Sequence, residues 1–189
     1  METKSIGMKP LFTIHGGEYL FGNEVEARFP ELRIWVPSKD DGIDFLITNN
    51  KNKNPISFQV KYSKDFNWSH GNILLKPHTK SAGWYSIYRE KIEKSNADYW
   101  VLVNYDGFKK STDYIFIKPK ELISKFISLG RNSHRIESYV LVTNDLKCYE
   151  TRGLKKKEFN TLLSGGLEKK ERDLTPYLER WDIIENNFR

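Results

Sequence analysis

The sequence predicts an α/β fold: a helix, three consecutive strands, a second helix and a fourth strand, forming a mixed central sheet flanked by helices. Two apolar runs, residues 43–47 and 56–62, flank a polar segment rich in Asn and Lys, which is typical of an antiparallel hairpin. A third apolar run, Ala97–Asn104, follows a segment that we expect to be helical. Such a crossover normally makes its two strands parallel, so the predicted sheet is mixed.

The segment before the hairpin supplies the first helix and the first strand. Within residues 18–29, Phe21, Val25 and Phe29 recur every four positions, which is the spacing of one helical stripe. The apolar run of residues 32–36 is short and is followed by a proline, so we expect the first strand there.

The second helix is expected at residues 83–94. Tyr85, Ile87, Tyr88 and Ile92 supply its apolar positions. This helix would carry the chain from the hairpin to the fourth strand.

Residues 105–189 are expected to add C-terminal α/β structure to a core at residues 17–104. We predict strands at 114–117 and 138–143, a short return through Cys148, and helices at 119–129, 155–163 and 175–188. The last helix would begin at Thr175 and present one apolar face made of Tyr177, Leu178, Trp181, Ile184 and Phe188. Because no linker or repeat divides the chain, residues 1–189 are predicted to form a single domain.

Composition narrows the class of protein. The net charge is +6 among 189 residues, which is compatible with a polyanionic partner but does not require one. The lone Cys148 excludes an internal disulfide and a thiolate metal cluster. The chain has no apolar run near the ~20 residues that cross a bilayer and no signal-peptide pattern, so we expect no membrane partner and a cytoplasmic location.

Several common sites are absent from the sequence. Neither a Gly-x-x-x-x-Gly-Lys phosphate loop nor a Gly-x-Gly-x-x-Gly turn occurs, so no nucleotide cofactor is expected. The four histidines (His15, His70, His78 and His134) are scattered and lack the i, i+4 pairing of a zinc-binding helix.

Three polar residues on the predicted hairpin suggest a site. Asp44 stands at the start of one strand, and Gln59 and Lys61 lie two apart on the next, so these two share a face. A carboxylate, an amide oxygen and an ammonium near one point can hold Mg²⁺ and activate a water against a phosphodiester. The alternative is structural: Asp44 would satisfy turn donors, and Gln59 and Lys61 would form the solvated face of a half-buried strand.

Around these residues the sequence resembles a known family. Asp41-Gly42-Ile43-Asp44 followed by Phe58-Gln59-Val60-Lys61-Tyr62 resembles the core of the PD-(D/E)xK nucleases, in the variant with Gln in place of the second acid. The similarity is greatest to Mrr-type restriction endonucleases and covers residues 17–104. It implies a restriction-endonuclease-like fold.

The resemblance also implies ligands for Mg²⁺, for which Mn²⁺ could substitute. Asp44 would be the bridging ligand, with the Gln59 side-chain oxygen and the Val60 carbonyl as further ligands. Lys61 would orient or deprotonate the attacking water, or stabilise the pentacovalent phosphate.

A further acid is implied upstream. Gly22-Asn23-Glu24-Val25-Glu26 is similar to the Gly-x-x-x-Glu helix that supplies an extra acid in this group, which makes Glu26 a fourth catalytic and metal-binding candidate. Glu18 and Glu24 are its rivals.

The long polar segment after the third strand, residues 63–81, has no periodicity of its own. Its basic and aromatic residues suit phosphate contact and base stacking, and the DNA-binding candidates are Lys64, Trp68, His70, Lys76 and Lys80. A solvated loop with Trp68 turned inward fits the same pattern.

The expected function is that of a Mg²⁺-dependent endonuclease of the type II restriction or defence kind, acting on double-stranded DNA as a homodimer. Residues 105–189 would serve target recognition or dimerisation. Two alternatives remain: a structure-selective enzyme like a Holliday-junction resolvase, and a catalytically inactive nucleic-acid-binding module.

Overall fold

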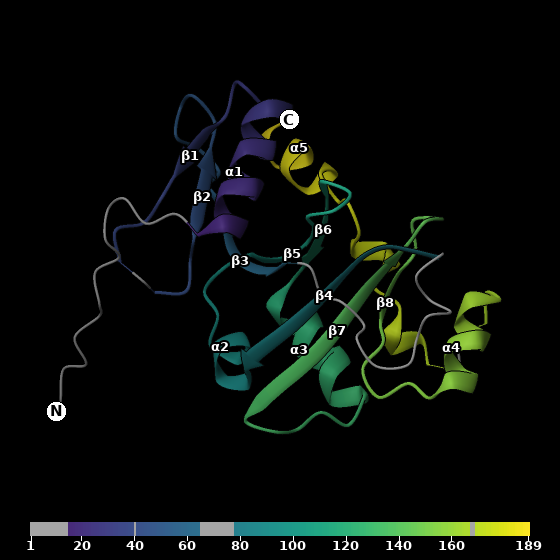
Figure 1. Ribbon diagram of the computed structural model, residues 1–189. Helices are drawn as coiled ribbons and strands as arrows, with labels where there is room; N and C mark the ends of the chain where they lie inside the picture. Colours follow the sequence, from purple (N-terminus) through teal and green to yellow (C-terminus); the bar gives the residue numbers. More distant parts are fainter. Residues whose placement is uncertain (1–14, 40, 65–77, 167–168) are drawn as a thin grey trace, which may run out of the picture.

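The computed structural model describes residues 15–39, 41–64, 78–166 and 169–189, which form two β-sheets and five α-helices (Figure 1). The helices are α1 (Gly16–Arg28), α2 (Arg89–Glu93), α3 (Pro119–Ser128), α4 (Lys156–Leu163) and α5 (Asp182–Phe188), with short 3-10 turns at Lys170–Arg172 and Thr175–Tyr177. The strands are β1 (Arg33–Trp35), β2 (Phe45–Thr48), β3 (Ile56–Lys64), β4 (Thr79–Tyr88), β5 (Tyr99–Asp106), β6 (Ser111–Ile117), β7 (Arg135–Thr143) and β8 (Cys148–Glu150).

The central sheet has the strand order β1-β2-β3-β5-β6. Its strands are antiparallel neighbours except for β3 and β5, which run parallel. The prediction of an α/β fold with a mixed sheet flanked by helices is therefore confirmed in general kind.

Helices α1 and α5 cover one face of this sheet (Figure 1). Phe21 of α1 is fully buried and lies with its ring centroid 5.2 Å from that of Phe58 and 6.0 Å from that of Trp181. Aromatic pairs at these separations add to the free energy gained from burial alone. The aromatic cluster fixes α1 on the sheet, which matters because the first turn of α1 borders the candidate site.

The opposite face packs against α3 and a second, antiparallel sheet of order β4-β7-β8. Trp100 and Leu102 of β5 meet Ile87 of β4 and Val140 of β7 in this second core. Each sheet therefore buries one apolar face against the other, as layered α/β proteins require.

The helix predicted at residues 83–94 is wrong over most of its length. Residues up to Tyr88 belong to β4, which pairs with β7, and only Arg89–Glu93 is helical. Tyr85 and Ile87 are buried while Trp84 and Tyr88 are exposed, so the burial alternates with the period of two that a strand imposes.

The single C-terminal helix predicted from Thr175 is also wrong. The chain makes a 3-10 turn at Thr175–Tyr177, bends at Glu179 with φ of 52°, and becomes helical again only at Asp182. The expected apolar face is divided, because Leu178 packs against the core between the sheets whereas Trp181 lies in the core under α1.

The predicted core, residues 17–104, and the predicted C-terminal additions, residues 105–189, share both sheets. That boundary falls inside β5, β6 forms an edge of the central sheet, and β4 pairs with β7. Within the described residues, no helix is long and apolar enough to span a membrane.

Candidate functional site

A pocket of about 890 Å³ opens beside the central sheet where β2 begins and β3 continues past it. Three segments form its walls: the start of α1, residues 41–44 together with 59–62, and α2 with the residues that follow it. The fold thus brings together segments from three separate parts of the chain.

Asp44 lies immediately before β2, at the point where pairing with β3 stops. Its backbone N–H donates to the Phe58 carbonyl (2.8 Å), and its carboxylate accepts hydrogen bonds from the Val60 N–H (2.8 Å) and from the Gln59 side-chain amide. The carboxylate therefore replaces a strand partner for Val60. Only 4% of Asp44 is exposed, so its orientation is set by the backbone around it.

Gln59 and Lys61 share the face of β3 that Asp44 approaches. Phe45 pairs with Phe58, which places the preceding Asp44 opposite Gln59, and Lys61 is two residues further along. The Lys61 ammonium lies 5.4 Å from the ring centroid of Trp100 on β5. All three predicted hairpin residues line the pocket.

Among the predicted acids of α1, Glu18 lines the pocket, and Glu26 is exposed and does not. Eight residues separate them, which is about 12 Å along a helix. Glu24 pairs instead with Arg28 at 2.7 Å. Glu18 is only 5% exposed. Its carboxylate accepts a hydrogen bond from the His15 N–H (3.4 Å), which ties the side chain to the start of α1.

Glycines permit this close approach. A Cβ on Gly17 would lie 2.4 Å from the Cβ of Tyr62, so only glycine lets the start of α1 pack so tightly on β3. Gly42 has φ of +87° in the turn that delivers Asp44, a conformation that favours glycine. In the sequence, only the two glycines before Glu18 hint that this acid can approach β3 closely. The periodicity of the apolar residues of α1 gives no such indication.

Helix α2 forms the wall that sequence reasoning missed. Lys91 and Lys94 line the pocket together with Glu90 and Ser95. In the sequence, these two lysines do not differ from those of any solvated helix face. Lys94 forms an ion pair with Glu90 (3.5 Å), and Lys91 adds a further positive charge to this wall.

The predicted DNA-binding residues are placed unevenly. Lys80 does not line the pocket, and its ammonium pairs with the buried carboxylate of Asp113. Lys64 ends β3, where its backbone pairs with Tyr105. Trp68, His70 and Lys76 lie outside the described residues.

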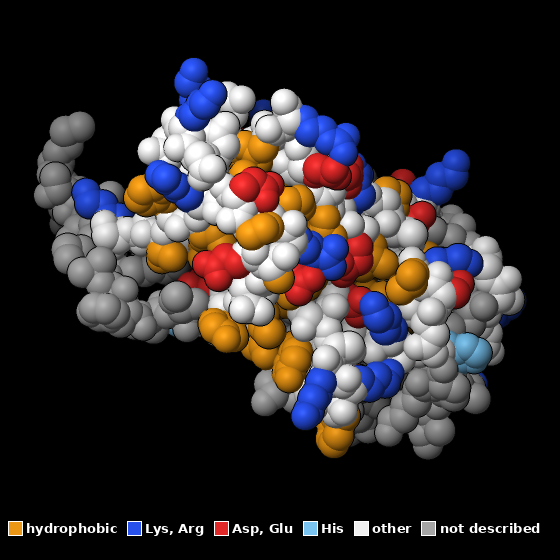
Figure 2. Space-filling view, turned by 90° about the horizontal axis from the view of Figure 1, so that it is seen from above, with side chains coloured by type: hydrophobic (Ala, Val, Ile, Leu, Met, Phe, Trp, Pro, Cys, Tyr) orange, Lys and Arg blue, Asp and Glu red, His pale blue; other side chains and the backbone are white. Residues whose placement is uncertain are grey.

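The positive charge is not gathered on the face that Figure 2 shows. Basic, acidic and apolar side chains are interspersed there, and neither sign of charge dominates. The net charge of +6 therefore does not mark this face as a polyanion-binding surface.

The oxygen donors of the pocket fit Mg²⁺. This ion takes one or two carboxylates together with water and substrate phosphate, and the pocket offers Glu18, Asp44, the Gln59 amide and the Val60 carbonyl. Over the described ranges, no group of three or more His, Cys, Asp or Glu side chains is arranged to hold a metal ion.

The Gln59 amide has two possible orientations. Here its nitrogen donates to Asp44, so the amide oxygen is turned away from that carboxylate. Rotating the amide by half a turn would bring two oxygens together, which is favourable only with a cation between them.

Comparison with known proteins identified no relative: no protein-family model, curated protein or solved structure matches the chain. The geometry and chemistry of the pocket therefore carry the functional proposal.

Proposed function

We propose that the protein is a Mg²⁺-dependent endonuclease with a restriction-endonuclease-like core, which hydrolyses phosphodiester bonds of double-stranded DNA and acts as a homodimer. The observation that supports this proposal most is that one pocket is lined by Asp44, Gln59, Lys61 and Glu18. These are the groups that the resemblance to PD-(D/E)xK nucleases requires, with Glu18 in place of Glu26.

The acids of the pocket provide the cation site. Four acids line the pocket: Glu18 and Asp44, which are buried, and Asp41 and Glu90. The hydrogen bond from the Val60 N–H holds the Asp44 carboxylate in one orientation. A bound Mg²⁺ would supply charge neutralisation at the phosphate and a more acidic water.

The basic groups act on the phosphate and the water. Lys61 would orient the attacking water or stabilise the charge that develops on the phosphate oxygens. The start of α1 adds the positive end of a 13-residue helix, which favours an anion. Lys91 and Lys94 extend the positive charge along the opposite wall.

Cleavage of supercoiled plasmid in Mg²⁺ tests this function. We expect the wild type to nick or linearise the plasmid, Asp44→Ala to abolish cleavage, and Lys61→Ala to slow it by about 10²–10³-fold. Glu26→Ala is the matched control, because that acid is exposed outside the pocket, and it should cut like the wild type. Unchanged cleavage by both Asp44→Ala and Lys61→Ala would refute the proposal.

A further inference from the structure

The outer face of the second sheet is covered over only part of its area. On one part, Ala82, Leu141 and Tyr149 pack against Leu162 of α4 in a small apolar cluster. On β4 toward α2, the outward rings remain accessible to solvent, since Trp84 is 49% exposed and Tyr88 is 44% exposed. Large apolar rings that are exposed to this extent are a sign of a binding surface, whereas buried rings are expected in any core.

Three rings share this side of the second sheet, which we call the aromatic face: the exposed Trp84 and Tyr88 on β4, and the half-buried Tyr139 on β7. Trp84 and Tyr139 are directly paired across the two strands. Tyr88 lies four residues beyond Trp84 and so points to the same side of the sheet.

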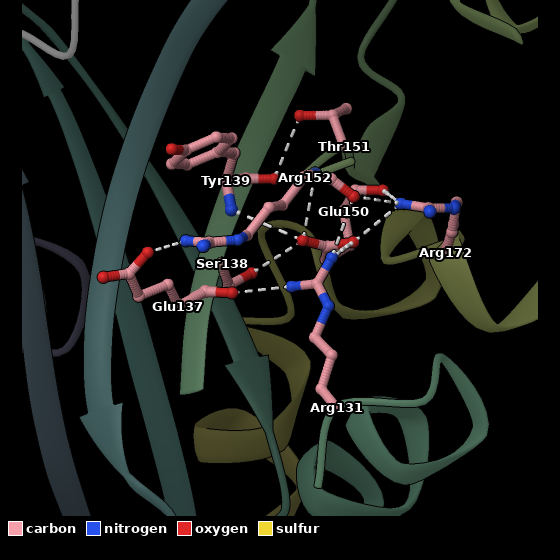
Figure 3. Close-up of polar contacts among 8 residues, drawn as sticks. All are labelled: Arg131, Glu137, Ser138, Tyr139, Glu150, Thr151, Arg152 and Arg172. Atoms are coloured by element: carbon pink, nitrogen blue, oxygen red, sulfur yellow. Dashed lines mark hydrogen bonds and ion pairs between the residues drawn. The ribbon is translucent and has the colours of Figure 1, made fainter. Parts of the chain in front are cut away.

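Arginines lie against two of these rings. The Arg135 guanidinium carbon is 5.9 Å from the centroid of the Tyr88 ring, and that of Arg152 is 5.4 Å from the centroid of the Tyr139 ring. Figure 3 shows Arg152 beside Tyr139, where it forms an ion pair with Glu137. Guanidinium groups stacked on exposed rings combine a π surface with a positive charge.

Ion pairs beside this face fix two glutamates of the second sheet, Glu137 and Glu150. Glu150 is 1% exposed and is paired with Arg131 at 2.6 Å and with Arg172 at 2.9 Å (Figure 3). Arg152 is paired with Glu137. Arg135 donates a hydrogen bond to the Ser86 hydroxyl and lies over the Tyr88 ring, which places its positive charge on the aromatic face.

The aromatic face adjoins the candidate active site. Tyr88 is the residue that precedes α2, and both Lys91 of that helix and Lys94 directly after it line the pocket. The Trp84 N–H donates to the Ser63 hydroxyl of β3 (2.8 Å), which ties β4 to the strand that carries Gln59 and Lys61.

We propose that the aromatic face binds a single strand of nucleic acid, with bases stacked on Trp84 and Tyr88 and the backbone phosphates near Arg135. Exposed rings interleaved with arginines suit unpaired bases and phosphates, because every base presents a π face and every linkage an anion. Paired bases would not present those faces. The inference rests on the proposed function and deepens it: the strand held here would be an unpaired segment next to the duplex that the pocket cuts.

Binding is tested without cleavage, in EDTA, by fluorescence anisotropy of a labelled oligothymidine and of a blunt duplex of equal length. We expect the single strand to bind more tightly than the duplex. Trp84→Ala and Tyr88→Ala should each weaken single-strand binding about 5- to 100-fold. Trp35→Ala is the matched control, since Trp35 is 48% exposed on β1 of the other sheet, and it should leave the affinity unchanged.

The charge contribution has its own readout. Arg135→Ala should reduce the slope of log Kd against log salt by about 0.7 for one lost contact with a single-stranded phosphate. Circular dichroism and thermal unfolding establish that each variant is folded. Equal binding by Trp84→Ala, Tyr88→Ala and Trp35→Ala, no measurable single-strand binding by the wild type, or tighter binding of the duplex would overturn the inference.

The two proposals fail separately. If Asp44→Ala loses plasmid cleavage while Trp84→Ala binds the single strand normally, the pocket remains a nuclease site and the aromatic face does not bind nucleic acid. If the wild type binds the single strand but cuts no plasmid, the aromatic face stands and the proposed hydrolysis falls.

Discussion

Replacing Gly17 by alanine tests whether the packing of α1 on β3 sets the geometry of the pocket. The new Cβ would lie 2.4 Å from the Cβ of Tyr62, which is attached to the backbone and cannot rotate away. To reach an ordinary contact of 3.4 Å, the start of α1 must move by about 1 Å relative to β3. Glu18, the next residue, moves with it.

The expected consequences concern both rate and stability. A displacement of about 1 Å in a catalytic group can lower the rate about 10²-fold, so we expect plasmid cleavage by Gly17→Ala to fall by about that factor. Overpacking should reduce the free energy of unfolding by about 1–3 kcal/mol and lower Tm by about 2–4 °C for each kcal/mol.

Gly16→Ala is the control for this prediction. Its Cβ would lie 3.6 Å from Cε1 of Tyr62, an ordinary contact, so cleavage and Tm should stay near those of the wild type. Plasmid cleavage and thermal unfolding, measured on both variants in parallel, provide the comparison. If Gly17→Ala and Gly16→Ala are indistinguishable in both assays, the close contact does not set the position of Glu18.

Two further predictions concern the interior. Gly83→Ala would place a Cβ 2.1 Å from Oδ1 of the buried Asn104, so urea unfolding should show a loss of about 1–3 kcal/mol, and an unchanged midpoint would contradict the packing described. Burial raises the pKa of Glu179, so the folded state holds this proton more tightly than the unfolded chain does. The protonated Glu179 carboxyl therefore stabilises the folded state fully below the pKa of an ordinary glutamate. This stabilisation is lost as the pH rises through the raised pKa of the folded state. The stability of the wild type relative to Glu179→Gln should therefore fall as the pH rises above about 4, and a rise in relative stability would contradict this prediction.

The hairpin and its polar residues were predictable because strand periodicity is local. Alternation along residues 56–62 is enough to place Gln59 and Lys61 on one side of β3, and the short connection to β2 brings Asp44 opposite Gln59. No knowledge of distant contacts was needed for this part of the site.

The remaining walls of the pocket depend on tertiary contacts. Whether Glu18 or Glu26 reaches the pocket is decided by where α1 crosses β3, and that crossing depends on the contact between Gly17 and Tyr62. Spacing within the helix carries no information about that crossing point. The position of Lys91 likewise depends on how α2 packs, so it could not be inferred from the sequence.

β4 was predicted as a helix because its apolar residues fit two periods at once. Tyr88 and Ile92 are four apart, as on a helix, while Tyr85 and Ile87 are two apart, as on a strand. Pairing with β7, about fifty residues later in the chain, decides between them. The aromatic face remained hidden for the same reason, since only the pairing of β4 with β7 brings Trp84 beside Tyr139.

Calorimetric titration with Mn²⁺ in the absence of DNA tests most directly whether Glu18 and Asp44 hold a divalent cation in this pocket. The account predicts measurable binding by the wild type, loss of that binding in Glu18→Gln and in Asp44→Asn, and wild-type binding by Glu26→Gln. A wild type that binds no Mn²⁺, or an Asp44→Asn variant that binds it as the wild type does, would contradict the central claim.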